Sequence, residues 1–112
     1  MTGQGNPGLR TVVVGVGNEF RRDDGAGPEV IARLRALQVA VDALTGVVDG
    51  AASSHSIGLG DTVELARVLG RLPERLTVLA VVGCDFGFGT ELTAEVAAAV
   101  PELVERVREI VR

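Results

Sequence analysis

The sequence predicts an α/β fold, a three-layer α/β/α sandwich around a small, mostly parallel sheet. Two unalternating apolar runs, 11–16 and 76–82, are typical of strands buried on both faces. Each run is followed by a glycine-containing loop and then by apolar residues at helical spacing. The chain has 112 residues, 46% of them hydrophobic and only 3% aromatic, so it holds one domain with an aliphatic core.

The first predicted unit is strand, loop and helix. TVVVGV, residues 11–16, is rich in β-branched side chains and leads into Gly17. The segment that follows, 17–25, carries two aspartates and is called the acidic loop below. Pro28 suits the first position of a helix. The inward face of that helix is predicted to be Val30, Ile31, Leu34 and Leu37.

The middle of the chain, residues 39–50, leaves alternatives open. Residues 39–44 suit a fragment of either strand or helix, and 47–50 suit a very short strand that ends in a turn. A helix is predicted over 56–72, where apolar residues recur at helical spacing before Pro73.

The last predicted unit begins with the second buried strand, 76–82. A glycine-rich loop, GCDFGFGTELT, spans 83–93, and Thr93 is a plausible N-cap for a final helix over 95–111. That helix is predicted to turn six apolar side chains inward, Val96, Val100, Leu103, Val104, Val107 and Ile110. Residues 1–10 are expected to be a flexible leader without an apolar signal core, and 11–112 a single domain.

Charge and cysteine content exclude several classes of protein. The formal net charge of −4 argues against nucleic-acid binding, which needs clustered Lys and Arg. No apolar run approaches the roughly 20 residues of a membrane span, so no membrane partner is expected. A single cysteine, Cys84, fits a reducing compartment and a cytoplasmic location.

The acidic loop resembles a nucleotide-binding loop only at its start. Gly15 and Gly17 match the dinucleotide fingerprint, but Phe20 replaces its third glycine. Asp23 and Asp24 would repel a pyrophosphate at the helix start. Two interpretations therefore stay open: Asp24 caps the helix, or the carboxylates bind a cation at the carboxyl end of a strand.

The only histidine, His55, directly precedes a predicted helix, between Ser54 and Ser56. A helix N-terminus disfavours imidazolium, and neutral imidazole is the form that binds metal. No cysteine-protease signature surrounds Cys84, for which an apolar packing role is expected. No serine sits in a nucleophile elbow.

Three blocks of sequence resemble the hydrogenase maturation protease family. They are GVGNEFRRDDGAGP (15–28), the Ser-His pair with GRLPERLTVLAVVG further on, and the glycine-rich loop with the last helix. The resemblance covers most of residues 11–105 and implies an endopeptidase that trims the C-terminal extension of the nickel–iron hydrogenase large-subunit precursor. It also implies a site where an acidic residue of the first loop, an Asp after a middle strand and a His meet at nickel carried by the substrate.

On this resemblance Asp24 and His55 occupy the acidic and histidine positions and are the candidate catalytic and metal-binding residues. The segment between Gln38 and Ser54 is shorter than the family pattern, so a reduced number of strands is expected. DALTG, residues 42–46, looks like the tail of a missing helix. Asp49 is the candidate third nickel ligand, and Asp42 the weaker alternative.

The shortened middle also predicts apolar edges that favour a homodimer. The alternative function is therefore a truncated, non-catalytic paralogue that acts as a binding or self-associating module.

Overall fold

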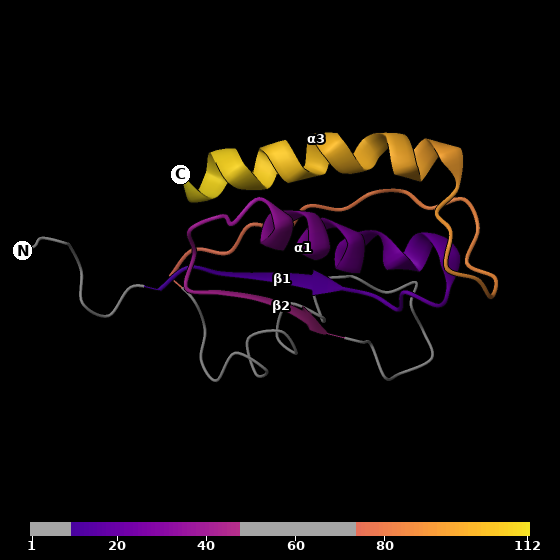
Figure 1. The fold of residues 1–112 in the computed structure, drawn as a ribbon, viewed down its shortest axis with the longest axis horizontal. Coiled ribbons are helices and arrows are strands. Elements are labelled where there is room, and N and C mark those ends of the chain that lie inside the picture. Colours follow the sequence, from indigo (N-terminus) through magenta and orange to yellow (C-terminus); the bar gives the residue numbers. More distant parts are fainter. Residues whose placement is uncertain (1–9, 48–73) are drawn as a thin grey trace, which may run out of the picture.

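The structure, a computed structural model, describes residues 10–47 and 74–112. The predicted helix over 56–72 and all but the last residue of the predicted leader lie outside them. The described elements are, in chain order, β1 (Val12–Val16), a 3-10 turn (Arg22–Gly25), α1 (Ala26–Ala36), β2 (Ala43–Val47) and α3 (Ala94–Val111) (Figure 1). None of the described helices is long and apolar enough to cross a membrane.

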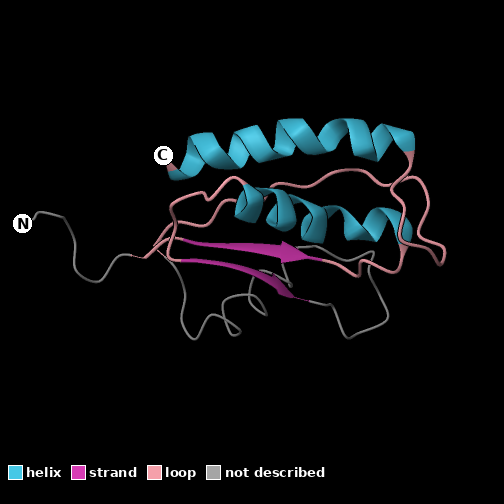
Figure 2. Cartoon of the chain, in the orientation of Figure 1, coloured by secondary structure: helices cyan, strands magenta, loops and turns pink. Residues whose placement is uncertain are grey.

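β1, α1 and β2 form a parallel β–α–β unit, shown by secondary structure in Figure 2. The register pairs Val12 with Ala43 and Val16 with Val47. Parallel neighbours need a crossover connection, which α1 supplies. The predicted α/β class with a small parallel sheet is confirmed for the described residues.

Two glycines let α1 approach the sheet at backbone distance. A Cβ on Gly27 would lie 2.5 Å from the Val16 carbonyl oxygen, and one on Gly15 would lie 2.5 Å from the Gly27 oxygen. The start of α1 therefore packs directly on the end of β1. This contact fixes where the acidic loop leaves the strand.

The core is aliphatic, and α1 lies between the sheet and α3 (Figure 1). Its buried residues are Val30, Ile31 and Leu34 of α1 and Val100 and Val104 of α3. Two predicted core residues are instead exposed, and both lie at the carboxyl end of a helix. These are Leu37, 51% exposed, and Ile110, 45% exposed.

The prediction of a buried strand over 76–82 is wrong within the part of the chain that the structure describes. This segment makes no strand pairing with the other described residues, and Val78 and Val82 are 51% and 89% exposed. Residues 79–81 instead line a hollow beside Leu103 and Arg106 of α3. A short apolar run fixes neither pairing nor burial, because a strand also needs a partner for its backbone groups.

Residues 43–46 are likewise not the tail of a helix, because they pair with β1 as part of β2. Leu44 packs against the core beneath α1, and the β-branched Thr45 that follows it suits a strand. The alternative of a strand within 39–44 is closer to the structure, although β2 begins only at Ala43.

The close contact between α1 and β1 predicts unequal effects for two Gly→Ala changes. Gly27→Ala should lower the free energy of unfolding by about 1–3 kcal/mol, because only backbone atoms surround the new methyl group. Gly46→Ala is the control, because its Cβ would meet nothing nearer than 3.8 Å. Urea denaturation followed by circular dichroism measures both. Equal effects would contradict the packing described here.

Candidate functional site

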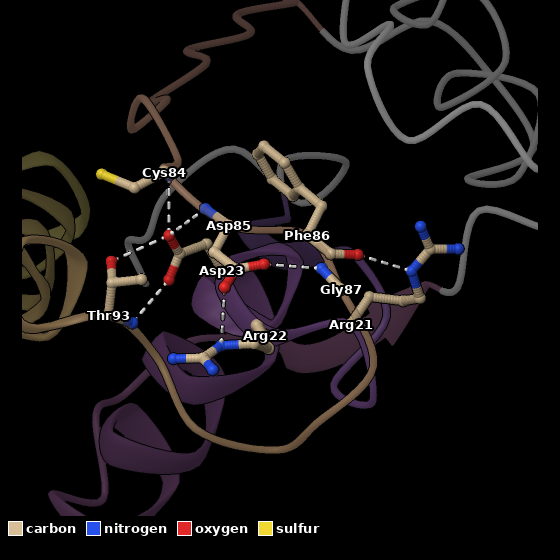
Figure 3. A network of polar contacts seen from close by, with 8 residues as sticks. All are labelled: Arg21, Arg22, Asp23, Cys84, Asp85, Phe86, Gly87 and Thr93. Carbon is tan, nitrogen blue, oxygen red and sulfur yellow. Dashed lines mark hydrogen bonds and ion pairs between the residues drawn. The ribbon is translucent and has the colours of Figure 1, made fainter.

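The carboxylate of Asp23 is the centre of a buried polar network (Figure 3). Its side chain is 3% exposed and accepts four hydrogen bonds. Oδ2 accepts from the amides of Cys84 at 2.7 Å and Asp85 at 3.0 Å and from Thr93 Oγ1 at 2.8 Å. Oδ1 accepts from the Thr93 amide at 2.7 Å. Every donor comes from the glycine-rich loop, 61 to 70 residues further along the chain.

These donors keep Asp23 charged. Burial raises the pKa of this carboxyl, but the hydrogen bonds from Thr93, Cys84 and Asp85 outweigh burial and lower the pKa to about 2. A buried carboxylate with this many donors is stable, whereas the same group without them would carry a large desolvation penalty.

Backbone hydrogen bonds also join the acidic loop to the glycine-rich loop, and these contacts together are called the junction below. The Asp23 amide donates to the Asp85 carbonyl at 3.0 Å, and the Arg22 amide donates to the Gly89 carbonyl at 2.9 Å. The Gly89 amide in turn donates to the Phe20 carbonyl at 2.9 Å. The acidic loop and the glycine-rich loop are therefore joined along their length, with Asp23 at the buried end.

Side chains on the outer side reinforce the junction. Arg21 Nε donates to the Phe86 carbonyl at 2.8 Å, and Arg22 Nε lies 3.5 Å from Asp85 Oδ2 (Figure 3). Asp85 also accepts from the Gly87 amide at 2.8 Å, which closes a tight turn in the glycine-rich loop.

The junction contains unusual backbone conformations. Gly17 and Gly89 have φ of +143° and +147°, which side chains resist, and Arg22 has φ of +47°. A non-glycine residue at positive φ costs of the order of 1 kcal/mol or more and persists only where its surroundings hold it. Here the Arg22 amide bond to Gly89 and the Asp85 ion pair hold it.

Asp24 lies just beyond the carboxyl end of β1 and is partly buried. Its Oδ2 accepts from the Asn18 amide at 2.8 Å, which closes the acidic loop on itself. It does not cap the following helix, because the N-cap of α1 is Gly25, with no side-chain cap bond. The capping interpretation is therefore wrong, and the cation-binding interpretation of Asp24 stays a prediction.

The other predicted ligands are distributed as follows. Asp42 lies at the amino ends of the two strands, where it accepts a hydrogen bond from the Thr11 amide beside the start of β1. The acidic loop lies at the carboxyl ends, so Asp42 cannot serve as the alternative third ligand. Asp49 and His55 lie outside the described residues. Within the described ranges, no group of three His, Cys, Asp or Glu residues could hold a metal ion.

Two predictions for the glycine-rich loop have mixed outcomes. Thr93 is the N-cap residue of α3 as predicted, but its hydroxyl donates to Asp23 instead of capping the helix. Cys84 is exposed and does not pack in the core, which corrects the expected apolar role. Cys84 contributes to the network through its backbone amide, which donates to Asp23 Oδ2.

The sequence prediction missed the role of Asp23. The adjacent pair of aspartates was the available signal, but spacing alone does not tell which carboxylate is buried and which stays accessible. The donors lie on a distant loop, so no local pattern identifies them.

A shallow hollow of about 170 Å³ lies between the acidic loop, α1 and the end of the glycine-rich loop. Glu19, Glu29 and Thr90 supply its polar lining, and Pro28 and Leu92 are among its apolar residues. Its volume suits one side chain and not a peptide segment.

Comparison with known proteins shows similarity to a protein family and to a solved structure. The sequence profile of the hydrogenase maturation protease family (HycI) matches residues 37–110. This match begins after the acidic loop. The resemblance of the acidic loop to the family therefore depends on the loop's own sequence motif. A search among curated proteins finds no significant match.

The solved structure is the hydrogenase 2 maturation peptidase from Thaumarchaeota archaeon SCGC_AB-539-E09. It is similar to this chain with a TM-score of 0.66 and 22% identity, over 92% of this chain and 98% of that chain. At this identity the likeness shows the fold, which agrees with the α/β arrangement described above.

The low pKa of Asp23 predicts a specific loss of stability in acid. Its pKa is about 2 in the folded chain against an ordinary value of 3.8, so its contribution is complete above about pH 5 and declines as the pH falls from about 4 toward 2. Asp23→Asn should therefore flatten the pH dependence of the unfolding free energy in this window. It should also lower stability at neutral pH by about 2–4 kcal/mol, because Asn brings donors to a site made of donors.

Urea denaturation from pH 6 to pH 2.5 measures both effects. Asp24→Asn is the matched control for the loss of a neighbouring carboxylate. A slope that persists in Asp23→Asn would assign the acid sensitivity to another carboxylate.

Proposed function

Because the chain belongs to the hydrogenase maturation protease family, we propose that it is an endopeptidase that acts on the nickel–iron hydrogenase large-subunit precursor. It recognises nickel in the precursor and removes the C-terminal extension. Nickel belongs to the substrate in this proposal and is not a resident cofactor of the enzyme.

The observation that carries the proposal is the different environment of two neighbouring carboxylates. Asp23 accepts hydrogen bonds from four donors, whereas Asp24 accepts one from the described residues, the bond from the Asn18 amide. A carboxylate with unused lone pairs at the carboxyl end of a strand suits a cation. The rigid junction at Asp23 would keep Asp24 in one position, which metal recognition requires.

The proposed nickel ligands are Asp24, His55 and Asp49. Asp49 follows Val47, the last described residue of β2, by two positions in the sequence, and Val47 is level with Val16 in the register. Because β1 and β2 run parallel, β2 ends at the same end of the sheet at which the acidic loop leaves β1, and this supports the choice of Asp49 as the third proposed ligand. Carboxylate oxygen and imidazole nitrogen are both suitable ligands for nickel.

The chain's own residues would divide the work between recognition and positioning. Asp24 and His55 would bind the nickel of a completed precursor, and the glycine-rich loop would bring its backbone close to the extension. Nickel, when bound, polarises a peptide carbonyl or lowers the pKa of a water molecule. Asp23 would act only through position, by joining the loop that bears Asp24 to the loop that contacts the peptide.

A second candidate function is a non-catalytic, self-associating module. The exposed side chains of Val78 and Val82, in a run with the composition of a strand, favour it. In this case the chain would bind a second copy or the large subunit without cutting.

The proposed ligands predict a loss of trimming in two variants. Asp24→Asn and His55→Ala should each lower the rate of extension removal by at least about 100-fold, because each removes a metal ligand. Asp42→Asn is the matched control, because Asp42 lies at the amino ends of the two strands and asparagine keeps an acceptor for the Thr11 amide. Mass spectrometry of the nickel-loaded precursor after incubation gives the rate.

Circular dichroism should show that all three variants fold. Trimming that survives both Asp24→Asn and His55→Ala would overturn the site, and a folded chain that never trims would favour the binding module.

Recognition of substrate-borne nickel predicts that the metal state of the precursor decides cleavage. The same precursor without nickel should stay uncut, because the carboxylate and imidazole would have no ion to bind. The two precursors can be compared side by side by gel mobility. Equal cleavage of both would contradict nickel recognition and leave the family assignment unaffected.

A further inference from the structure

We propose that three phenylalanines and one arginine on the joined loops form the docking surface for the C-terminal extension. This aromatic–arginine patch consists of Phe20 and Arg21 of the acidic loop and Phe86 and Phe88 of the glycine-rich loop. The inference rests on the proposed function and specifies how that function's peptide substrate is bound.

The patch gathers all the aromatic side chains of the protein. The sequence has three Phe and no Trp or Tyr, and Phe20, Phe86 and Phe88 are 60%, 42% and 91% exposed. Single exposed apolar residues are ordinary, but Arg21 lies over the Phe88 ring, and arginine and aromatic residues are the types that contribute most to binding surfaces. The core is aliphatic, so these rings are not needed for packing.

The patch is held in shape before any ligand arrives. Arg21 forms an isolated parallel bridge with Gly89, and Phe20 and Phe88 each precede this bridged pair by one position. The Arg21 guanidinium lies 5.4 Å from the centroid of the Phe88 ring, and its Nε donates to the Phe86 carbonyl at 2.8 Å. A surface ordered in this way loses little entropy when it binds.

Gly83 gives Phe86 its place in the patch. A Cβ on Gly83 would lie 2.3 Å from Cζ of the Phe86 ring, so the ring packs against the glycine backbone. The ring is thereby kept partly exposed on the same loop as Phe88.

Charge complementarity selects the occupant. Arg22 is paired with Asp85, whereas no carboxylate of the described residues forms an ion pair with Arg21. On a protein of net charge −4, a guanidinium among aromatic rings favours an apolar ligand that carries a carboxylate. A C-terminal extension carries the terminal carboxylate of its chain by definition. We therefore assign Arg21 to that carboxylate and the rings to the apolar side chains before it.

The patch also lies close enough to the proposed nickel site for one peptide to reach both. Only two residues separate Arg21 from Asp24 in the sequence, so their Cα atoms lie within about 11 Å. A few residues of extended peptide span such a distance.

Binding of a short peptide tests the patch independently of cleavage. The probe is acetyl-Ala-Leu-Ala-Phe with a free carboxylate, compared with the same peptide as a C-terminal amide, titrated into ¹⁵N-labelled protein. The free acid should shift the amide signals of Arg21 and of residues 86–89. The C-terminal amide should bind at least about tenfold more weakly, because it lacks the charge-assisted bond to the guanidinium.

Variants extend the same titration. Phe88→Ala and Arg21→Gln should each weaken binding of the free acid at least about fivefold. Ile110→Ala is the control, because Ile110 is 45% exposed but lies on α3, outside the patch. Phe88 is 91% exposed, so its loss should leave the fold intact. Equal binding of acid and amide, or full binding by Phe88→Ala, would overturn the proposal.

Cleavage of the nickel-loaded precursor separates this proposal from the proposed function. Phe88→Ala should raise KM at least about fivefold and change kcat less than twofold, because it affects peptide binding and not the metal ligands. A native KM would overturn the patch and leave the endopeptidase function standing. Absence of cleavage by the unchanged protein would overturn the function, and the peptide titration would still decide the patch. A dimer in sedimentation that Phe88→Ala dissociates would make a second copy the occupant and overturn the proposal.

Discussion

The four hydrogen bonds that the buried carboxylate of Asp23 accepts hold together the two loops that carry the proposed site. The donors all belong to the glycine-rich loop, so one side chain joins segments more than 60 residues apart in the sequence. One donor, Thr93, is also the first residue before α3, and α3 packs on α1 in the core. The same carboxylate therefore fixes the loop, the start of the last helix and, through the chain, the position of Asp24. Removal of its charge leaves several buried donors without a partner, which is why a polar network of this kind is either complete or destabilising.

Two adjacent aspartates thus have two different environments. Asp23 accepts four hydrogen bonds from the glycine-rich loop, while Asp24 accepts one from the described residues, at the end of the sheet where ligands bind in open α/β folds. The loops that Asp23 joins also carry the exposed phenylalanines and Arg21. One buried anion consequently supports both the proposed metal ligand and the proposed peptide surface. The proposed discrimination between a metal-loaded precursor and an empty one would require a rigid scaffold of this kind beneath the ligands.

Local pattern was sufficient for some parts of the fold and insufficient for others. β1 and the buried face of α1 follow from a β-branched run and from helical spacing, which are properties of contiguous residues. The strand at 43–47 and the unpaired run at 76–82 did not follow, because pairing depends on a partner that the local sequence does not name. α3 continues through Pro101, where the missing amide would suggest a break, because its valines are buried on both sides of the proline. The role of Asp24 was predicted from its motif and stays a prediction, whereas the role of Asp23 was not predicted, since its donors are distant in sequence.

Hydrogen exchange of individual amides tests most directly whether Asp23 joins the two loops. The amides of Cys84, Asp85 and Thr93 donate to its carboxylate and should exchange slowly in the unchanged protein. In Asp23→Asn these three amides should lose most of their protection, while those of Ile31 and Leu34 in α1 stay protected relative to the global stability of that variant. Unchanged protection of the three loop amides in Asp23→Asn would contradict the account, because the loops would then be joined without the buried charge.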